Sequence, residues 1–433
     1  MTVNGLRKNK IKVMDLIANL LIALQFDLFY LISTEFKLGQ GILLVASAFI
    51  IVKYIKLTGK IIEINNIIIA YLLVLLFTGA YQVTRIFGGS VVTAFLAERV
   101  FWVYIIFYIA LKKLYYSRTI NNERCIKLLK YAGVIQLCLY FVQWILSNHV
   151  IFLHVLHGSR YGSARFYFQP ILLILLLCFC VSDFLNKKKS IIWIVLILAE
   201  ILIVQKYRMT TLAIINAIFC SLLLYKGNFN KRITIIIVGI IAFVILINTQ
   251  IVQDIIQSIL NKGIDNSVKG RAAWQLWALL YQLRARPLLG NGFVYSAESY
   301  NYGAQYVALR YGWSFTPGDY GLIGFVYEYG LLGAGWFLLF LVSQLKRAFY
   351  VWKYGNNYAY IIFLFFIIVD SYSELYWIRS NGLFALVIYM VMLQYKYTEI
   401  LNNRNIEIHR GETVRKLIPQ KLSENIERQR SSL

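Results

Sequence analysis

The sequence predicts an all-α integral membrane protein with about twelve transmembrane helices, and three observations support this fold class. Of the 433 residues, 59% are hydrophobic and only 15% are charged. The mean hydropathy is +0.63. A helix that crosses a hydrocarbon core of about 30 Å needs roughly 20 mostly apolar residues, and the chain divides into such stretches almost from end to end. Soluble domains are far less apolar, so a water-soluble enzyme is excluded.

The predicted spans follow one another with short polar loops between most of them. They cover Val13–Thr34, Leu38–Ile55, Ile67–Val83, Val91–Leu111, Leu128–Leu146, Tyr167–Val181, Ile191–Val204, Met209–Tyr225, Ile233–Ile247, Tyr320–Val342, Tyr358–Trp377 and Leu383–Leu393. Several are short, so their flanking Tyr, Trp and Lys side chains must reach into the membrane interface. The spans form a predicted membrane domain over residues 1–395, and a basic tail over residues 396–433 follows it.

The distribution of Lys and Arg predicts the orientation of the spans, because short loops rich in these residues stay in the cytoplasm. If the spans alternate from a cytoplasmic N-terminus, 30 of the 44 basic residues lie in cytoplasmic loops or in the tail. This alternation requires a tight outer turn at Gln205–Arg208. We therefore expect a multi-pass protein of the inner or plasma membrane with both termini in the cytoplasm. The net charge of +24 follows from this topology and does not indicate nucleic-acid binding.

One predicted extracytoplasmic loop, from Thr249 to Asp319, is far longer than the others. Loops of this length are usually functional. Within it, Gly270-Arg271 begins a predicted helix that runs to Arg284 and ends before Pro287. Its aromatic face consists of Trp274, Trp277, Ala278 and Tyr281. Such a helix is also suited to lying on the membrane surface with its aromatic side chains in the interface.

Arginines gather in the predicted outer loops, against the usual topological bias. The long loop contains Arg271, Arg284, Arg286 and Arg310, the loop Ser147–Phe166 contains Arg160 and Arg165, and Arg208 lies in the tight turn. A guanidinium group presents a rigid fork that suits bidentate recognition of phosphate. These residues therefore indicate either a diphosphate-binding cavity or contacts with lipid headgroups. Interleaved tyrosines, such as Tyr300 and Tyr302, could stack on sugar rings or belong to an interfacial aromatic belt.

Ionisable residues inside the predicted spans are a second class of candidates, because a charge in a membrane is costly and usually faces a cavity or a partner. They are Asp27, Glu98, Arg99, Glu200, Asp370 and Glu374. Structural ion pairs and functional groups are both consistent with these positions. The outer histidines His149, His154 and His157 have no carboxylate or cysteine near them in sequence, so no metal site is predicted. The five cysteines give no disulfide framework.

Four pieces of the sequence resemble the O-antigen ligase and polymerase superfamily of bacterial membrane glycosyltransferases. The first two are Arg165 with Gln169-Pro170 and Arg208-Met209-Thr210. The third is Gly270-Arg271 followed by Pro287-Leu288-Leu289-Gly290-Asn291-Gly292. The fourth begins at Asp319-Tyr320 and ends in Glu328-Tyr329-Gly330-Leu331-Leu332-Gly333. The resemblance covers residues 160–345.

The chain departs from the ligase pattern at one informative position. Ligases of the superfamily have a histidine that precedes the last glycine pair by a fixed spacing, and Asp319 occupies that position here. The departure favours a polymerase over a ligase. Asp319 is either a group that orients or deprotonates the acceptor hydroxyl or the N-cap of the helix that begins near Tyr320.

The resemblance implies polymerisation of lipid-linked oligosaccharide repeat units into a surface polysaccharide: an O-antigen, a capsule or an exopolysaccharide. Glycan would pass from a polyprenyl-diphosphate carrier to the next lipid-linked unit. We expect Arg208 and Arg271 to bind the diphosphate, with Arg165, Arg160 and Arg310 as further candidates. Asp319 is the leading catalytic carboxylate, and Glu298 and Glu374 are alternatives. No metal or cofactor is expected, whereas a chain-length regulator and a flippase are expected partners.

Two other functions remain open from the sequence. A ligase of the same superfamily would transfer the finished glycan to another acceptor. A transporter or flippase of lipid-linked oligosaccharides would use the intramembrane carboxylates Asp27, Glu200 and Asp370 for an ion path. Many transporter folds contain internal repeats, and no repeat between the two halves of this chain is evident, which argues against transport.

Overall fold

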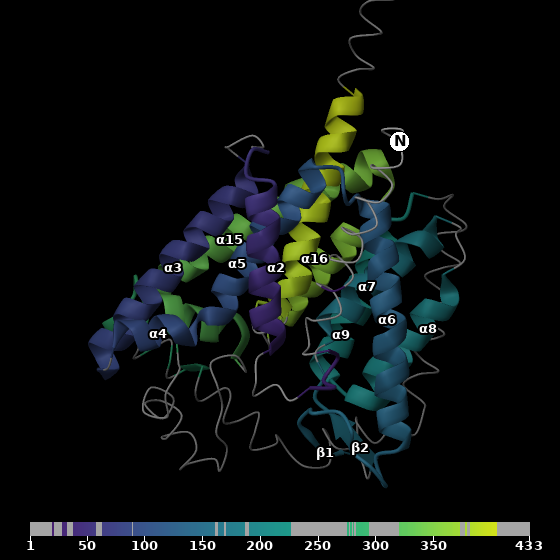
Figure 1. The fold of residues 1–433 in the computed structure, drawn as a ribbon, viewed down its shortest axis with the longest axis horizontal. Helices are drawn as coiled ribbons and strands as arrows, with labels where there is room; N and C mark the ends of the chain where they lie inside the picture. Colours follow the sequence, from purple (N-terminus) through teal and green to yellow (C-terminus); the bar gives the residue numbers. More distant parts are fainter. Residues whose placement is uncertain are drawn as a thin grey trace, which may run out of the picture.

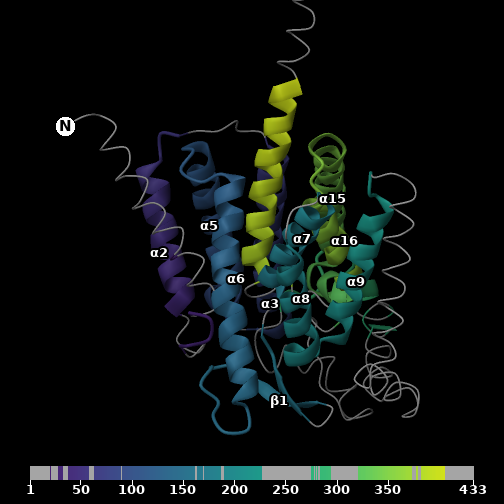
Figure 2. The same cartoon turned by 90° about the vertical axis from the view of Figure 1, so that its right-hand side faces the viewer.

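The computed structural model describes most of the chain, and the described residues are largely helical. They are residues 20, 28–32, 38–57, 63–88, 90–160, 163–168, 170–186, 190–226, 275–276, 278, 280, 283–293, 320–372, 377–378 and 382–404. The helices run alongside one another as a bundle, in which segments distant in sequence are neighbours (Figure 1). The view from the side shows the same alignment, with the β-hairpin at one end of the bundle (Figure 2).

The first part of the bundle contains α2 (Leu38–Lys53), α3 (Ile64–Phe87), α4 (Val91–Ala97), α5 (Arg99–Tyr116) and α6 (Asn122–Ile145). A hairpin of β1 (His157–Arg160) and β2 (Ser163–Phe166) follows. The second part contains α7 (Ile171–Leu185), α8 (Ile191–Ala199), the π-helix η2 (Glu200–Gln205), α9 (Arg208–Leu223), the single turn α13 (Leu283–Ala285), α15 (Gly321–Gly355) and α16 (Ala359–Asp370). A C-terminal helix covers Gly382–Arg404.

The hairpin corrects the all-α prediction. Its strands pair in an antiparallel register that places Gly158 opposite Arg165 and Arg160 opposite Ser163. Only Tyr161 and Gly162 separate the strands in sequence, and a two-residue connection that contains glycine is typical of a tight hairpin. The glycines and serines of this segment also disfavour a helix.

Four of the described helices are long and apolar enough to cross a membrane, or up to five if a bent pair counts as one span. They are α3, α6, α15 and the C-terminal helix, and the bent pair is α4 with α5. The predicted spans Val13–Thr34 and Ile233–Ile247 lie largely or wholly outside the described residues. The other predicted spans coincide with shorter apolar helices, such as α2, α7 and α16. The structure therefore supports a membrane protein of several apolar helices, and the number of twelve remains a prediction.

The predicted span Val91–Leu111 consists of two helices, α4 and α5, that together are apolar enough to form one bent span. Its two helices meet at an angle of 60° between Ala97 and Arg99. The residue at the break is Glu98, whose carboxylate is fully buried and accepts a hydrogen bond from the hydroxyl of Tyr329, with 3.3 Å between the oxygens. The break thus lets a polar side chain reach into the bundle. The predicted turn at Gln205–Arg208 is confirmed, because η2 ends at Gln205 and α9 begins at Arg208.

Contacts between helix ends show that many predicted cytoplasmic loops meet at one end of the bundle. Lys113 Nζ donates to the carbonyl oxygen of Ile55 at 3.4 Å, which joins the ends of α5 and α2. Lys226 Nζ donates to Trp352 O at 2.9 Å, which joins the end of α9 to α15. Arg404 donates to the Tyr350 hydroxyl at 3.2 Å. We call this the basic end; the opposite end, which carries β1 and β2, is the hairpin end.

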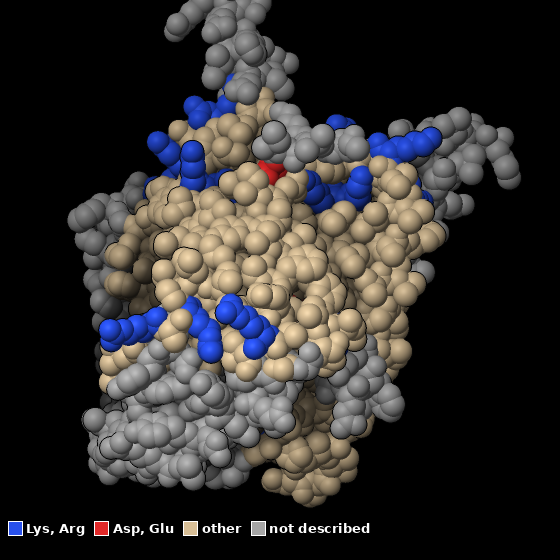
Figure 3. Space-filling view, turned by 90° about the vertical axis from the view of Figure 1, so that its left-hand side faces the viewer, with Lys and Arg blue, Asp and Glu red and all other residues tan. Residues whose placement is uncertain are grey.

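The surface charge follows the same division. Figure 3 shows Lys and Arg gathered along the upper edge of the molecule, a second and smaller row near the lower edge, and an uncharged belt between them. Exposed apolar side chains such as Val45, Val74 and Phe77 contribute to the surface of the helices. An apolar belt between two charged edges is the arrangement that a bilayer requires. The core is equally apolar, since Ile171–Val181 of α7 are all buried.

Candidate functional site

Two of the sequence pieces that share the family resemblance are in direct contact. Residues 286–292, here called the bracing loop, lie against α15 where this helix is broken at Gly330. In a regular helix, each carbonyl oxygen accepts a hydrogen bond from the backbone N–H four residues later, so Tyr327 and Glu328 would accept from Leu331 and Leu332. Here they accept instead from the backbone nitrogens of Asn291, at 2.9 Å, and Gly292, at 2.8 Å.

The other side of the break is completed in the same way. The backbone nitrogen of Leu331 donates to Pro287 O at 2.8 Å, and that of Leu332 donates to Leu288 O at 3.2 Å. The bracing loop thus supplies partners for two carbonyl groups and two N–H groups that the kink leaves unpaired. Irregular backbone in a membrane protein is tolerated where protein groups satisfy its hydrogen bonds, and the bracing loop meets this requirement.

Glycine is required at both contact surfaces. Gly330 has φ 63° and ψ −156°, a conformation that is essentially restricted to glycine. A Cβ atom on Gly330 would lie 2.6 Å from the backbone nitrogen of Gly290. A Cβ atom on Gly290, which has φ 68°, would lie 2.6 Å from the carbonyl oxygen of Glu328. The glycines of the two sequence pieces therefore allow two backbones to touch.

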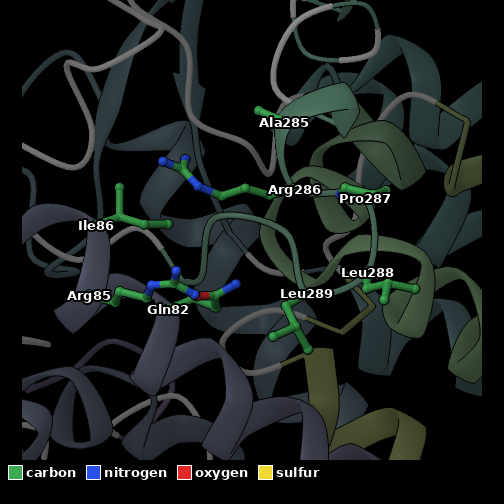
Figure 4. A pocket seen from close by; sticks show the side chains of 8 residues that line it. All are labelled: Gln82, Arg85, Ile86, Ala285, Arg286, Pro287, Leu288 and Leu289. Carbon is green, nitrogen blue, oxygen red and sulfur yellow. The ribbon is translucent and has the colours of Figure 1, made fainter.

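A cavity of about 440 Å³ lies beside the bracing loop at the hairpin end. It is lined by Gln82, Arg85 and Ile86 of α3 and by Ala285, Arg286, Pro287, Leu288 and Leu289. Figure 4 shows the guanidinium groups of Arg85 and Arg286 on the Ile86 side of the cavity, across from Pro287 and Leu288. Arg286 also donates to Asn291 Oδ1 at 2.6 Å, which fixes the side chain to the bracing loop.

Buried carboxylates lie behind the bracing loop. Glu98 and Glu328 have exposed fractions of 0% and 1%. A Cβ atom on Gly79 of α3 would meet both Glu98 Oε1, at 2.9 Å, and the Tyr329 ring, at 2.8 Å, so these groups pack tightly against the α3 backbone. Through its bond with the Tyr329 hydroxyl, Glu98 joins the α4–α5 break to α15. This arrangement favours the structural interpretation of Glu98.

A second cluster at the hairpin end joins Arg165, from another of the pieces, to the turn that directly precedes Arg208. Arg165 of β2 donates through Nε to the carbonyl oxygen of Gln205 at 3.0 Å, and Lys206 Nζ donates to Ala164 O at 3.0 Å. The Arg165 guanidinium lies over the rings of Tyr167 and Tyr207, at 4.3 Å and 5.0 Å from their centroids. The hairpin is thereby fixed to the η2–α9 turn, at which Arg208 begins α9.

A buried carboxylate underlies this turn as well. Glu200 is fully buried in η2, and Gln205 Nε2 donates to its two carboxylate oxygens at 2.6 and 2.8 Å. The widened π-helical turn brings these two side chains together, five residues apart. Lys206 then takes a left-handed backbone conformation with φ 55°, which lets the chain reverse into α9. Glu200 is therefore used locally to shape the turn that carries Lys206 and Arg208.

The structure describes some of the predicted diphosphate-binding residues and not others. Arg165 is described with its side chain, whereas for Arg160 and Arg208 only the backbone is, in β1 and at the start of α9. Arg271, Arg310, Glu298, Asp319 and Glu374 lie outside the described residues. Most of the predicted helix of the long loop lies outside the described residues; its described last part is the single turn Leu283–Ala285, which precedes Pro287. Within the predicted helix, Ala278 is buried and Leu276 and Leu280 are exposed, consistent with the face assigned to Ala278.

Gln82 and Arg85 were not predicted as site residues, and Arg286 was predicted only as one of several arginines of the long loop. In sequence, Arg85 is a single basic residue near the end of a predicted span, and Arg286 is one of several in the long loop. Only the contact between the bracing loop and α15 brings Arg286 to the end of α3. A useful signal was the pair of glycine-containing pieces, because both needed a close backbone partner. Compared with models of known families and with curated proteins, the chain matches none.

Proposed function

We propose that the protein polymerises lipid-linked oligosaccharide repeat units into a surface polysaccharide. The donor is a glycan chain on a polyprenyl-diphosphate carrier, and the acceptor is a hydroxyl group of the next lipid-linked unit. The proposal extends the family resemblance, which covers residues 160–345, to the whole chain.

One observation carries the proposal: two of the resembling pieces are in direct contact, and a third contacts the turn that directly precedes the fourth, both at the hairpin end. Residues 287–292 brace the break at Gly330, and Arg165 is bonded to the turn that precedes Arg208. Neither contact was used to recognise the pieces. A chance resemblance gives no reason for pieces more than 30 residues apart to meet in this pairwise order, whereas a shared architecture does.

The reaction requires a displacement at the anomeric carbon of the donor glycan. The acceptor oxygen forms the new glycosidic bond as the bond from this carbon to the diphosphate oxygen breaks. The acceptor proton passes to a base, for which Asp319 is the leading candidate and Glu298 the alternative. Polyprenyl diphosphate leaves with the bonding electrons, and nearby guanidinium groups stabilise its growing negative charge.

The basic pair of Arg165 and Lys206 fits the role of holding the leaving group. The Arg165 guanidinium is fixed by one backbone hydrogen bond and two aromatic rings, so little side-chain freedom is lost when a phosphate binds. Lys206 lies on the same turn and adds a second positive charge. Exposed Tyr167 beside them offers a flat face suited to a sugar ring.

Reconstitution of the purified protein with a lipid-linked repeat unit tests the proposal. The expected products are glycans of two or more repeats on one carrier, together with free polyprenyl diphosphate. Arg165→Ala should lower the rate at least about tenfold, because a charge-assisted contact to the leaving group is lost. Arg284→Ala is the matched control, since Arg284 is exposed and lies outside both clusters.

A deletion in cells that make the polymer separates the alternatives. Loss of a polymerase leaves surface glycans of one repeat. Loss of a ligase leaves long polymer on the lipid carrier, and loss of a flippase leaves single repeats on the cytoplasmic side. Either of the last two patterns would overturn the proposal.

A further inference from the structure

A stripe of exposed apolar side chains runs along α3 and ends at an arginine. Ile67, Val74, Phe77 and Tyr81 are 45%, 52%, 59% and 55% exposed. These residues and Arg85 are separated by three, four or seven positions, so all five lie on one face of the helix. The opposite face of α3 is buried in the bundle, with Leu72, Leu75 and Leu76 at 3% exposure or less. This face of α3 is therefore suited to contact an acyl or prenyl chain along the helix as far as Arg85.

The cavity lined by Gln82, Arg85 and Arg286 lies where this stripe ends. Among the described residues, the side chain of Arg85 has no ion pair or hydrogen bond, and the side chain of Arg286 bonds only to the neutral amide of Asn291. Two guanidinium groups without acidic partners on one side of a cavity leave positive charge for a ligand. Leu288, which is 62% exposed, adds an apolar contact at the rim of the same cavity.

Gln82 adds a hydrogen-bond acceptor to the cavity. Its side chain is 4% exposed, and Nε2 donates to Gly290 O at 3.5 Å. Its Oε1 atom is buried and has no hydrogen-bond partner among the residues that the structure describes. A buried acceptor of this kind is costly unless a donor reaches it. A hydroxyl group on the ligand would satisfy Oε1, whereas a phosphate oxygen would not.

We propose that this cavity binds the phosphate of a lipid headgroup that also carries a free hydroxyl group. The phosphate lies between Arg85 and Arg286, the hydroxyl donates to Gln82 Oε1, and the hydrocarbon chain follows the α3 stripe. Lipid phosphate of this kind has two sources, a glycerophospholipid and a polyprenyl-diphosphate carrier. An arginine at a helix end can also contact headgroups unselectively, and such contact would depend neither on Arg286 nor on Gln82.

Binding is measured on the purified full-length protein, stripped of lipid in detergent, so that no catalytic turnover is needed. The main probe is phosphatidylglycerol, with phosphatidylethanol as a probe of equal charge without a headgroup hydroxyl and phosphatidylcholine as the zwitterionic reference. Arg85→Ala should weaken phosphatidylglycerol binding at least about tenfold, the loss of one charge-assisted contact. Arg284→Ala should bind like the wild type. Arg85 is exposed and has no described partner, so its replacement should leave the melting temperature unchanged.

Gln82→Leu tests the hydroxyl contact separately. It should remove the preference for phosphatidylglycerol over phosphatidylethanol while leaving phosphatidylethanol binding intact. Equal weakening by Arg85→Ala and Arg284→Ala, or none by Arg85→Ala, would overturn the proposal. So would binding of inorganic phosphate as tight as that of any lipid. If only a polyprenyl-diphosphate-linked sugar, which carries free hydroxyl groups, binds in an Arg85-dependent way, the phosphate site stands and its lipid is the carrier. These binding results do not depend on the proposed polymerase activity. If the wild-type protein proved to have no such activity, the lipid site could still be confirmed or refuted.

Discussion

Replacing Gly330 with alanine tests whether the bracing loop holds α15 together. The backbone at Gly330 has φ 63° and ψ −156°, and forcing alanine into this region costs about 1–3 kcal/mol. The new methyl group would also lie 2.6 Å from the Gly290 nitrogen, so the bracing loop must move away. If at least two of the four backbone hydrogen bonds break, each contributing roughly 1 kcal/mol, the total loss of stability is about 4 kcal/mol.

The measurement is the melting temperature of the detergent-solubilised protein, which should fall by about 4 °C. Gly41→Ala is the matched control, because Gly41 lies within α2 and a Cβ atom there would meet nothing within 4 Å. Alanine at this helical position should stabilise slightly, by up to about 1 kcal/mol. If Gly330→Ala melts like Gly41→Ala, the bracing loop does not support the helix.

Further predictions concern topology and chemistry. Leu156, at the hairpin end, is 80% exposed. In a variant without the five native cysteines, an impermeant thiol reagent applied to intact cells should label Leu156→Cys and should not label Asn403→Cys. The reverse pattern of labelling would mean that the orientation is inverted. Arg208→Ala should lower polymer formation at least about tenfold, with partial rescue by lysine, because a point charge cannot replace a bidentate fork; normal glycan length at matched protein level would return Arg208 to headgroup contact. Asp319→Asn should abolish polymerisation without changing the melting temperature, because asparagine is a good helix cap and a poor base; an active variant would make Asp319 a cap.

Periodicity and charge predicted the helices better than their shapes. The split at Gln205–Arg208 was predictable because a single helix would have placed a basic cluster on the wrong side. The 60° break at Glu98 was not, since a charged pair inside an apolar run is equally compatible with a straight helix whose charges face a partner. At the break, Glu98 contacts Tyr329, a residue far away in sequence, and sequence patterns do not show such a contact.

For the candidate site too, the sequence indicated individual residues but not the tertiary contacts that bring them together. The pieces around Gly290 and Gly330 stand out in sequence because of their glycines, and Arg165 and Arg208 stand out as arginines in outer loops. Their pairing depends on backbone contacts, which leave no trace in residue type. Arg85 was overlooked because one arginine at the end of an apolar helix is ordinary. Its significance comes from Arg286, which the bracing loop brings to it.

The broken helix also bears on how the chain is assembled in the membrane. The portion of α15 before the break, Gly321–Tyr329, is only about 13 Å long at 1.5 Å per residue, too short to cross a bilayer alone. When α15 first enters the membrane, any kink would leave the carbonyls of Tyr327 and Glu328 unpaired in hydrocarbon, at several kcal/mol each. The newly inserted α15 should therefore be a single straight helix. Because residues 286–292 are synthesised before α15, they are already present when it inserts, and their docking imposes the bend only after the helices have come together.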